Sequence, residues 1–213
     1  MSSVFSPTGV MSFEEFVAWK PDHRAYELYE GIPFEMQPVG QHEEIVGYLT
    51  VKIAVEIARS DLPYFLPKQA LIKPPSRASG MTPLIESAYC ADVMAIKRAE
   101  LSSEPLWSSS STLTRGDSLA LVVEVVSTNW RTDYGYKLTD YEALGILEYW
   151  IVDYVPLGGR RAIGDPRLPT VSIYRLLDNE FSLEQFRGDE LIVSGIFPDI
   201  NLTADQIFTA NSK

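Results

Sequence analysis

The chain has 213 residues, of which 46% are hydrophobic, and this is enough to bury one sizeable core. We therefore expect a single domain spanning residues 1–213. The formal net charge of −11 argues against a protein that coats nucleic acid, because phosphate backbones are bound by clustered Lys and Arg. The single cysteine, Cys90, excludes an internal disulfide framework, and no apolar run approaches the roughly 20 residues of a membrane span. These features predict a cytoplasmic protein with no membrane partner.

The chain begins with a helix and a pair of strands. Ser12 and Glu15 have the spacing of a capping box, which predicts a short helix that Pro21 ends. Alternating residues at 26–30 and 32–36, separated by a glycine, predict two strands joined by a tight turn.

A long helix follows. Ile45, Leu49, Ile53 and Ile57 recur every four residues, which predicts an amphipathic helix over 42–59. Beyond it we expect a strand at 64–72 and a loop at 74–83, which is rich in Pro, Ser and Gly.

The middle of the chain holds two apolar strands. Residues 91–96 form a short apolar run that contains one acid, and residues 102–116 are predicted to be a loop because they include four consecutive serines. Residues 119–126 are the most hydrophobic stretch, interrupted only by Glu124. Their β-branched content and length predict a central strand buried on both faces.

The last third alternates between helices and strands. Residues 132–144 are predicted to be a helix with Gly145 at its C-terminal cap, and residues 147–152 another apolar strand. A loop, two alternating strands and a final helix are then expected at 158–169, 171–177, 181–187 and 204–208. This order predicts an α/β domain with a mixed central sheet flanked by helices and extended by antiparallel edge strands.

Asp92 and Glu124 are the most informative pair for function. Each is an acid in a strand whose neighbours are otherwise apolar. Burying an unpaired carboxylate costs several kcal/mol or forces a proton onto it, so a compensating group is expected. A hard divalent ion is one such group, and Mg²⁺ typically takes one or two carboxylates and waters. The alternative is that each acid lies at a strand end and faces water.

The helix after Glu124 carries further polar residues on one face. Asp133, Lys137 and Tyr141 are spaced i, i+4 and i+8. One interpretation is that Lys137 points from this face toward Asp92 and Glu124. The other is an ordinary surface ion pair between Asp133 and Lys137.

Several segments together resemble a known family. They are Tyr26-Glu-Leu before Gly31, His42 at the start of the long helix, Asp92-Val93, Glu124-Val-Val-Ser127, Asp133-Xaa3-Lys137-Xaa3-Tyr141, and Gly145 followed by Glu148 to Asp153. This pattern resembles the Uma-type restriction endonuclease family of the PD-(D/E)XK nuclease superfamily. The likeness extends from about Ser12 to the final helix, and it implies a restriction-endonuclease-like core.

The resemblance also implies roles for individual residues. Asp92 matches the first metal-binding acid of the superfamily and Glu124 the second, and the carbonyl of Val125 is then a third ligand. The usual lysine position of the superfamily is occupied here by Val126. Lys137 matches a lysine that this family places on the following helix.

Two more residues are carried over, and one departure is visible. Glu27 matches an acid of the Tyr-Glu-Leu segment, although Glu30 is a rival for its role and either could simply be solvated. His42 matches a histidine of the family, and its alternative is a partly exposed residue at a helix start. Ala91 replaces the proline of the Pro-Asp pair, which removes no chemical group.

The resemblance implies a metal-dependent nuclease that uses Mg or Mn and hydrolyses phosphodiester bonds, with DNA as the expected nucleic-acid partner. The candidates for a basic patch that contacts phosphate are Arg98, Arg115, Arg131, Lys137, Arg160 and Arg161, and the alternative is that they are scattered solvated charges. The alternatives are a catalytically inactive module of the same fold that binds nucleic acid or a protein, and a hydrolase acting on another phosphoester. Apolar residues in the edge-like segments 171–174 and 181–186 predict a homodimer.

Overall fold

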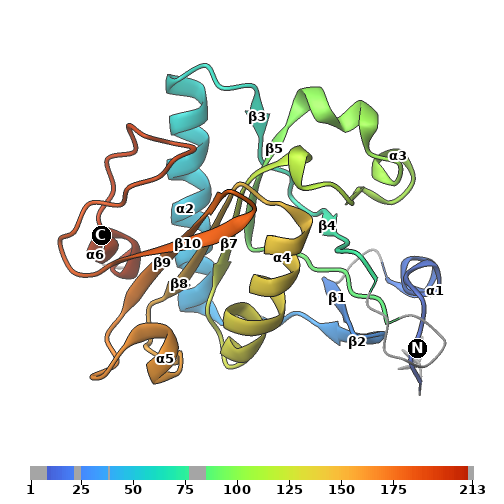
Figure 1. Ribbon diagram of the computed structural model, residues 1–213, viewed down its shortest axis with the longest axis horizontal. Helices are drawn as coiled ribbons and strands as arrows, with labels where there is room; N and C mark the ends of the chain where they lie inside the picture. The colour runs from blue at the N-terminus through green and yellow to red at the C-terminus, as the bar shows by residue number, and fades with distance from the viewer. Residues whose placement is uncertain (1–8, 22–24, 38, 77–84, 211–213) are drawn as a thin grey trace.

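A six-stranded mixed sheet forms the centre of the molecule in the computed structural model (Figure 1). The structure describes residues 9–21, 25–37, 39–76 and 85–210. Its strand order is β10-β9-β8-β7-β5-β3. The strands are β3 (Tyr64–Phe65), β5 (Val93–Lys97), β7 (Leu119–Val125), β8 (Glu148–Asp153), β9 (Thr170–Leu177) and β10 (Glu180–Phe186). Only β7 and β8 are parallel, and the other neighbouring pairs are antiparallel.

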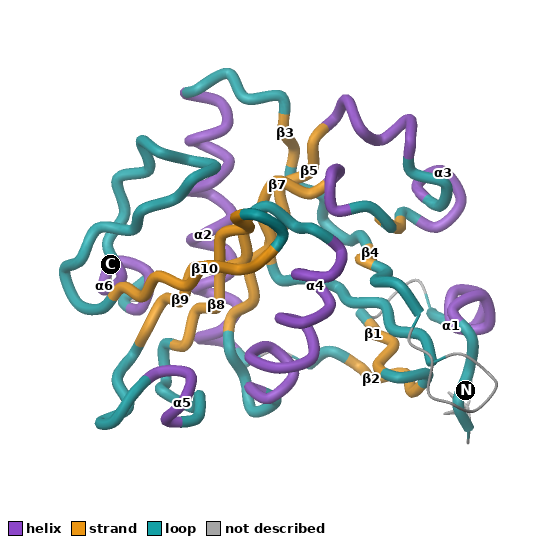
Figure 2. Tube along the Cα trace, viewed as in Figure 1, coloured by secondary structure: helices purple, strands orange, loops and turns teal. Residues whose placement is uncertain are grey.

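The two faces of the sheet pack against different helices (Figure 2). On one face Ile45, Leu49 and Ile53 of α2 (Gly40–Arg59) pack with residues of β7 such as Val123. On the other face Tyr141 of α4 (Leu138–Leu144) packs with residues of β7 such as Val122. Every residue of β7 is buried, which confirms the prediction of a central strand covered on both faces.

The remaining elements surround this core. They are the helices α1 (Phe13–Trp19), α3 (Trp107–Ser110), α5 (Arg160–Ile163) and α6 (Ala204–Phe208), the 3₁₀ helices η1 (Arg98–Ser103) and η2 (Gly116–Ser118), the π-helix η3 (Thr132–Lys137), the antiparallel pair β1 (Tyr26–Tyr29) and β2 (Ile32–Glu35), and the parallel pair β4 (Leu71–Ile72) and β6 (Thr112–Leu113). The capping box predicted at Ser12 and Glu15 is present, and Gly145 ends α4 with a left-handed φ of 85°.

Three predictions of local structure need correction. The strand predicted at 64–72 is two short strands, because β3 pairs with β5 and β4 pairs with β6 in a separate sheet. The loop predicted at 102–116 contains α3 and β6, and the loop predicted at 158–169 contains α5. Most of the loop predicted at 74–83 lies outside the described residues.

The arrangement confirms the predicted α/β class, with a mixed central sheet extended by the antiparallel strands β9 and β10. Across the described residues, no helix is both long enough and apolar enough to span a bilayer.

Candidate active site

A cavity of about 220 Å³ opens at the end of the sheet where β7 finishes. All six residues that the sequence proposed for the site lie along its wall, together with eight others. The full lining is Glu27, Tyr29, Phe34, Glu35, Met36, His42, Asp92, Glu124, Val125, Ser127, Asn129, Thr132, Asp133 and Lys137. Segments far apart in the sequence thus meet at one place.

Asp92 and Glu124 are brought together by the pairing of β5 with β7. Val93 is opposite Val123 in this antiparallel pair, so one further step of the register places Asp92 opposite Glu124. Side chains opposite each other project to the same face, here the face covered by η3 and α4. The Asp92 carboxylate also accepts a hydrogen bond of 2.7 Å from the backbone N–H of Val125. The two carboxylates thus come from neighbouring segments of the sheet and project to the same face.

Lys137 projects from η3 into the site and is not a surface residue. Its Nζ lies 2.9 Å from Glu27 Oε1, 3.0 Å from Glu124 Oε1 and 3.9 Å from Asp133 Oδ1, and its side chain is 3% exposed. Burial lowers the pKa of the ammonium, but the surrounding carboxylates outweigh burial and hold it well above its ordinary value. The interpretation of an ordinary surface ion pair with Asp133 is therefore wrong.

The structure distinguishes Glu27 from Glu30, the two glutamates that compete for one role in the site. Glu27 is buried, and its Oε1 accepts hydrogen bonds from the Cys90 backbone N–H at 3.0 Å and from Lys137. Glu30 lies in the turn after β1, and its backbone N–H donates to Ser87 Oγ. Its side chain is not part of the cavity wall, so Glu27 is the glutamate that faces the site.

His42 reaches the site from the first turn of α2. It is buried, and its Nε2 lies 3.3 Å from Asp92 Oδ2. Burial lowers the pKa of the imidazole, but the hydrogen bond and the charge of Asp92 outweigh that effect and raise it. A protonated His42 would therefore hold the Asp92 carboxylate in place, and the interpretation of a partly exposed residue does not hold.

Two residues absent from the predicted site belong to its structure. Asp133 lines the cavity and is buried, and the Tyr141 hydroxyl donates a hydrogen bond of 2.9 Å to Glu124 Oε1. The signal for both was the i, i+4, i+8 spacing with Lys137. Because no feature of the sequence indicates that this face of the helix is buried, Asp133 is indistinguishable there from a solvated partner of Lys137.

The site carries more acids than bases. Five carboxyl groups, those of Glu27, Glu35, Asp92, Glu124 and Asp133, line the cavity with only Lys137 and His42 as bases. Burial raises the pKa of Glu124 well above its ordinary value, with a further rise from the neighbouring carboxylates and against the opposing effect of the Lys137 charge. Burial likewise raises the pKa of Asp133 to about 7. The single ammonium of Lys137, 3.0 Å from Glu124 and 3.9 Å from Asp133, therefore does not fully compensate for the burial of these acids.

This surplus fits a divalent cation, whose preferred ligands are carboxylate and carbonyl oxygens. Within the described residues no group of three or more His, Cys, Asp and Glu side chains already converges as a set of metal ligands. Asp92 and Glu124 would therefore act with backbone or water oxygens, as is usual for Mg²⁺.

The six basic residues that the sequence suggested for phosphate contacts do not form one patch. β5 begins and β7 ends at the cavity, so Arg98, which follows β5, and Arg115, which precedes η2 and β7, lie at the opposite end of the sheet. Lys137 is buried inside the site. Arg131 directly precedes η3, and Arg160 and Arg161 lie in α5, which follows β8 at the same end of the sheet as Glu124.

Comparisons with known proteins agree with this fold. The crystal structure of "a putative nuclease belonging to DUF820" from Anabaena variabilis ATCC 29413 has a TM-score of 0.66 to this chain, over 92% of this chain and 97% of that one, at 15% sequence identity. At that identity the likeness concerns the fold. No curated protein matches the sequence. Residues 13–205, however, match the family described as "Putative restriction endonuclease" (Uma2), and the chain therefore belongs to this restriction-endonuclease-like family.

Proposed function

We propose that this protein is a metal-dependent nuclease of the PD-(D/E)XK class that hydrolyses phosphodiester bonds in DNA. The observation that carries the proposal is the buried ammonium of Lys137, held 2.9 Å from Glu27 and 3.0 Å from Glu124 beside a surplus of carboxylates. A structural ion pair needs one acid for one base, and this cavity is lined by five acids. Unbalanced carboxylates at an open cavity are expected where a cation binds.

Asp92, Glu124 and the carbonyl of Val125 would hold Mg²⁺ or Mn²⁺. When bound, such an ion polarises a phosphoryl oxygen and lowers the pKa of a coordinated water. The proposal involves no cofactor other than this metal ion.

The protein's own residues would supply positioning and charge. Glu27 and Glu124 keep Lys137 protonated, so its ammonium can donate a hydrogen bond to an oxygen that becomes negative as the bond breaks. Lys137 would replace the usual lysine of the superfamily, because Val126 at that position is 1% exposed and packs in the core. His42 would orient Asp92, and Tyr141 would orient Glu124.

Cleavage assays test the proposal directly. Supercoiled plasmid, linear duplex, single-stranded DNA and RNA would be incubated with the wild-type chain in Mg²⁺, in Mn²⁺ and in EDTA. We expect cleavage of DNA only with a metal, and a loss of at least about 100-fold in Asp92→Asn and in Glu124→Gln. Asp117→Asn, at an exposed acid at the other end of the sheet, is the matched control and should cleave normally.

Two outcomes would contradict the proposal. Cleavage that persists in EDTA, or that is equal in Asp92→Asn and the control, would exclude this site. Nucleic-acid binding without cleavage of any substrate would favour the inactive module instead.

We also propose that the chain forms a homodimer through β10. This strand is an edge of the sheet, and Leu183 on it is 46% exposed. The segment 171–174 is not an edge, because β9 is paired on both sides and these residues are buried. Light scattering should give twice the monomer mass, and a monomer at high protein concentration would contradict the proposal.

A further inference from the structure

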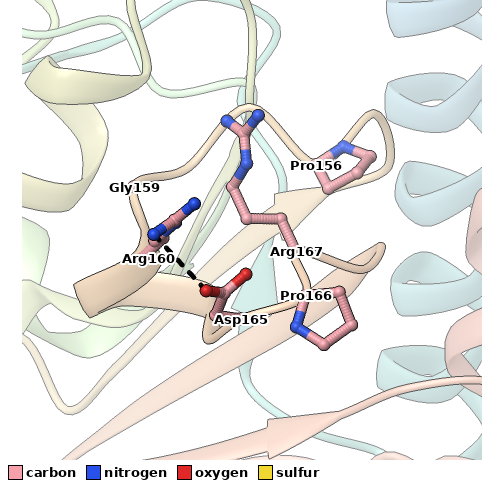
Figure 3. A pocket seen from close by; sticks show the side chains of 6 residues that line it. All are labelled: Pro156, Gly159, Arg160, Asp165, Pro166 and Arg167. Atoms are coloured by element: carbon pink, nitrogen blue, oxygen red, sulfur yellow. Dashed lines mark ion pairs between the residues drawn. The ribbon is translucent and has the colours of Figure 1, made fainter.

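The connection between β8 and β9, residues 154–169, carries three arginines and one acid. We call it the arginine loop. Arg160, Arg161 and Arg167 are all exposed, and Asp165 is its only acid. A local excess of positive charge is notable in a chain whose net charge is −11. Arg160, Arg167 and Asp165 line an open hollow of about 550 Å³. Figure 3 shows how their side chains lie around it.

Three arginines elsewhere in the fold have hydrogen-bonding partners inside the protein. Arg59 pairs with Glu56 at 2.6 Å, Arg175 pairs with Glu184, and Arg187 donates to the Ile163 carbonyl at 3.0 Å. In the arginine loop, Arg161 and Arg167 have no ion-pair partner among the described residues. Arg160 lies 3.4 Å from Asp165, but both side chains are mostly exposed, at 77% and 61%. Such a surface pair is worth little, so the charge of the loop remains open to a ligand.

The arginine loop is anchored and does not need to be ordered by a ligand. The buried Asp153 carboxylate accepts hydrogen bonds from the backbone N–H groups of Leu157 at 3.0 Å and Gly158 at 2.8 Å. Gln185 Nε2 donates to the Ala162 carbonyl at 2.7 Å, and Ile163 is 1% exposed. A surface that is already ordered loses less conformational entropy on binding.

The loop also adjoins the candidate active site. β7 and β8 are parallel with Glu124 opposite Ile151, so β8 leads into the loop at the end of the sheet where Glu124 lies. Trp130, from the segment between β7 and η3, packs so closely on Gly159 that a Cβ there would lie 3.1 Å from its ring. The guanidinium of Arg131 stacks over the same ring at 4.6 Å. Arg131 therefore extends the basic surface toward the cavity.

We propose that Arg131, Arg160, Arg161 and Arg167 form a binding surface for the sugar-phosphate backbone of nucleic acid and hold it beside the catalytic cavity. The inference rests on the proposed nuclease function and adds the means of substrate binding. A guanidinium presents a planar fork of donors that matches the oxygens of a phosphate group. The surface also explains how a strongly acidic protein can bind a polyanion, because its positive charge is gathered at the end of the sheet where the substrate must lie.

Matched double variants test the inference. Arg161→Ala/Arg167→Ala and Arg98→Ala/Arg115→Ala each remove two exposed positive charges, the first pair from the arginine loop and the second from the opposite end of the sheet. Binding of a fluorescent DNA duplex, a DNA single strand and polyglutamate would be followed by anisotropy from about 50 to 200 mM salt. Far-ultraviolet circular dichroism would confirm that both variants fold.

We expect the loop variant to bind DNA at least about tenfold more weakly at 50 mM salt, with a salt slope smaller by about 2 on a log–log plot. The control should bind within about twofold of the wild type. Arg161→Lys/Arg167→Lys should keep most of the slope because it keeps the charges. Equal binding by the loop variant and the control, no wild-type binding, or a preference for polyglutamate would each overturn the inference.

Cleavage measured in parallel separates this inference from the proposed function. If the wild type cleaves DNA and the loop variant cleaves equally well, the binding surface is refuted and the nuclease function stands. If the loop variant loses DNA binding but the wild type cleaves nothing, the binding surface stands and the nuclease function is refuted.

Discussion

Replacing Asp133 by asparagine should stabilise the protein in the absence of metal. The carboxyl group of Asp133 is buried, and burial raises its pKa from 3.8 to about 7. A carboxyl whose pKa is raised on folding contributes stability that is complete below its unfolded value and is lost as the pH rises through its folded value. At pH 8 the wild-type chain therefore holds a charge that opposes folding.

The size of this effect on the free energy of unfolding follows from the difference between the unfolded and folded pKa values of Asp133. At 1.36 kcal/mol per unit, the rise from 3.8 to about 7 corresponds to about 4 kcal/mol at pH 8. Asparagine has nearly the same shape and no charge, so Asp133→Asn should raise the free energy of unfolding by up to this amount. The gain should shrink by about 1.4 kcal/mol for each unit of pH between 7 and 5, because the wild-type carboxyl then binds a proton.

Urea unfolding in EDTA at pH 5, 6, 7 and 8 measures the effect in both proteins. Added Mg²⁺ should then stabilise the wild type more than the variant, because a cation offsets the charge that the variant lacks. A variant that is less stable than the wild type at pH 8 would refute the reasoning. So would a gain that does not change with pH, since it could not come from ionisation of Asp133.

Three further substitutions test other parts of the site and its support. Lys137→Met should lower DNA cleavage by at least about 100-fold, as a cleavage assay would measure. In urea unfolding without metal at pH 8, the same variant should lose about 3–5 kcal/mol of unfolding free energy, because it leaves buried carboxylates unpaired. Tyr141→Phe removes the hydrogen bond to Glu124 and should cost about 1–3 kcal/mol of unfolding free energy, with a melting temperature unchanged from wild type as the contrary result. Gly116→Ala should destabilise by about 1–3 kcal/mol in a thermal melt, because its Cβ would lie 2.3 Å from the Leu144 carbonyl oxygen.

The central fold could be predicted because its signals are local. The apolar spacing of α2 and the continuous hydrophobic run of β7 each determine one element from a few neighbouring residues. The strand predicted at 64–72 failed because its two ends pair with different partners, Phe65 with Ile96 and Leu71 with Thr112. Such pairing depends on residues distant in the sequence, and no local pattern reveals it.

The sequence predicts several of the residues that belong to the candidate site. It does not predict their burial or the electrostatic interactions among them. Asp92, Glu124 and Lys137 could be named from isolated polar residues in apolar runs and from the family resemblance. That Glu27, and not Glu30, faces the cavity depends on the placement of β1 beside Cys90. The role of Asp133 depends on its burial, which the sequence pattern of a half-polar helix does not show.

The π-helical turn η3 makes the active site sensitive to chain length. Asp133 and Lys137 lie in this turn, whose hydrogen bonds run from residue i to i+5 and therefore hold one residue more than an α-helical turn. Deleting one residue, for example the exposed Gly135, would favour an ordinary α-helix and turn one of the two side chains away from the cavity. Over evolutionary time this segment should therefore accept substitutions at its exposed positions far more readily than insertions or deletions.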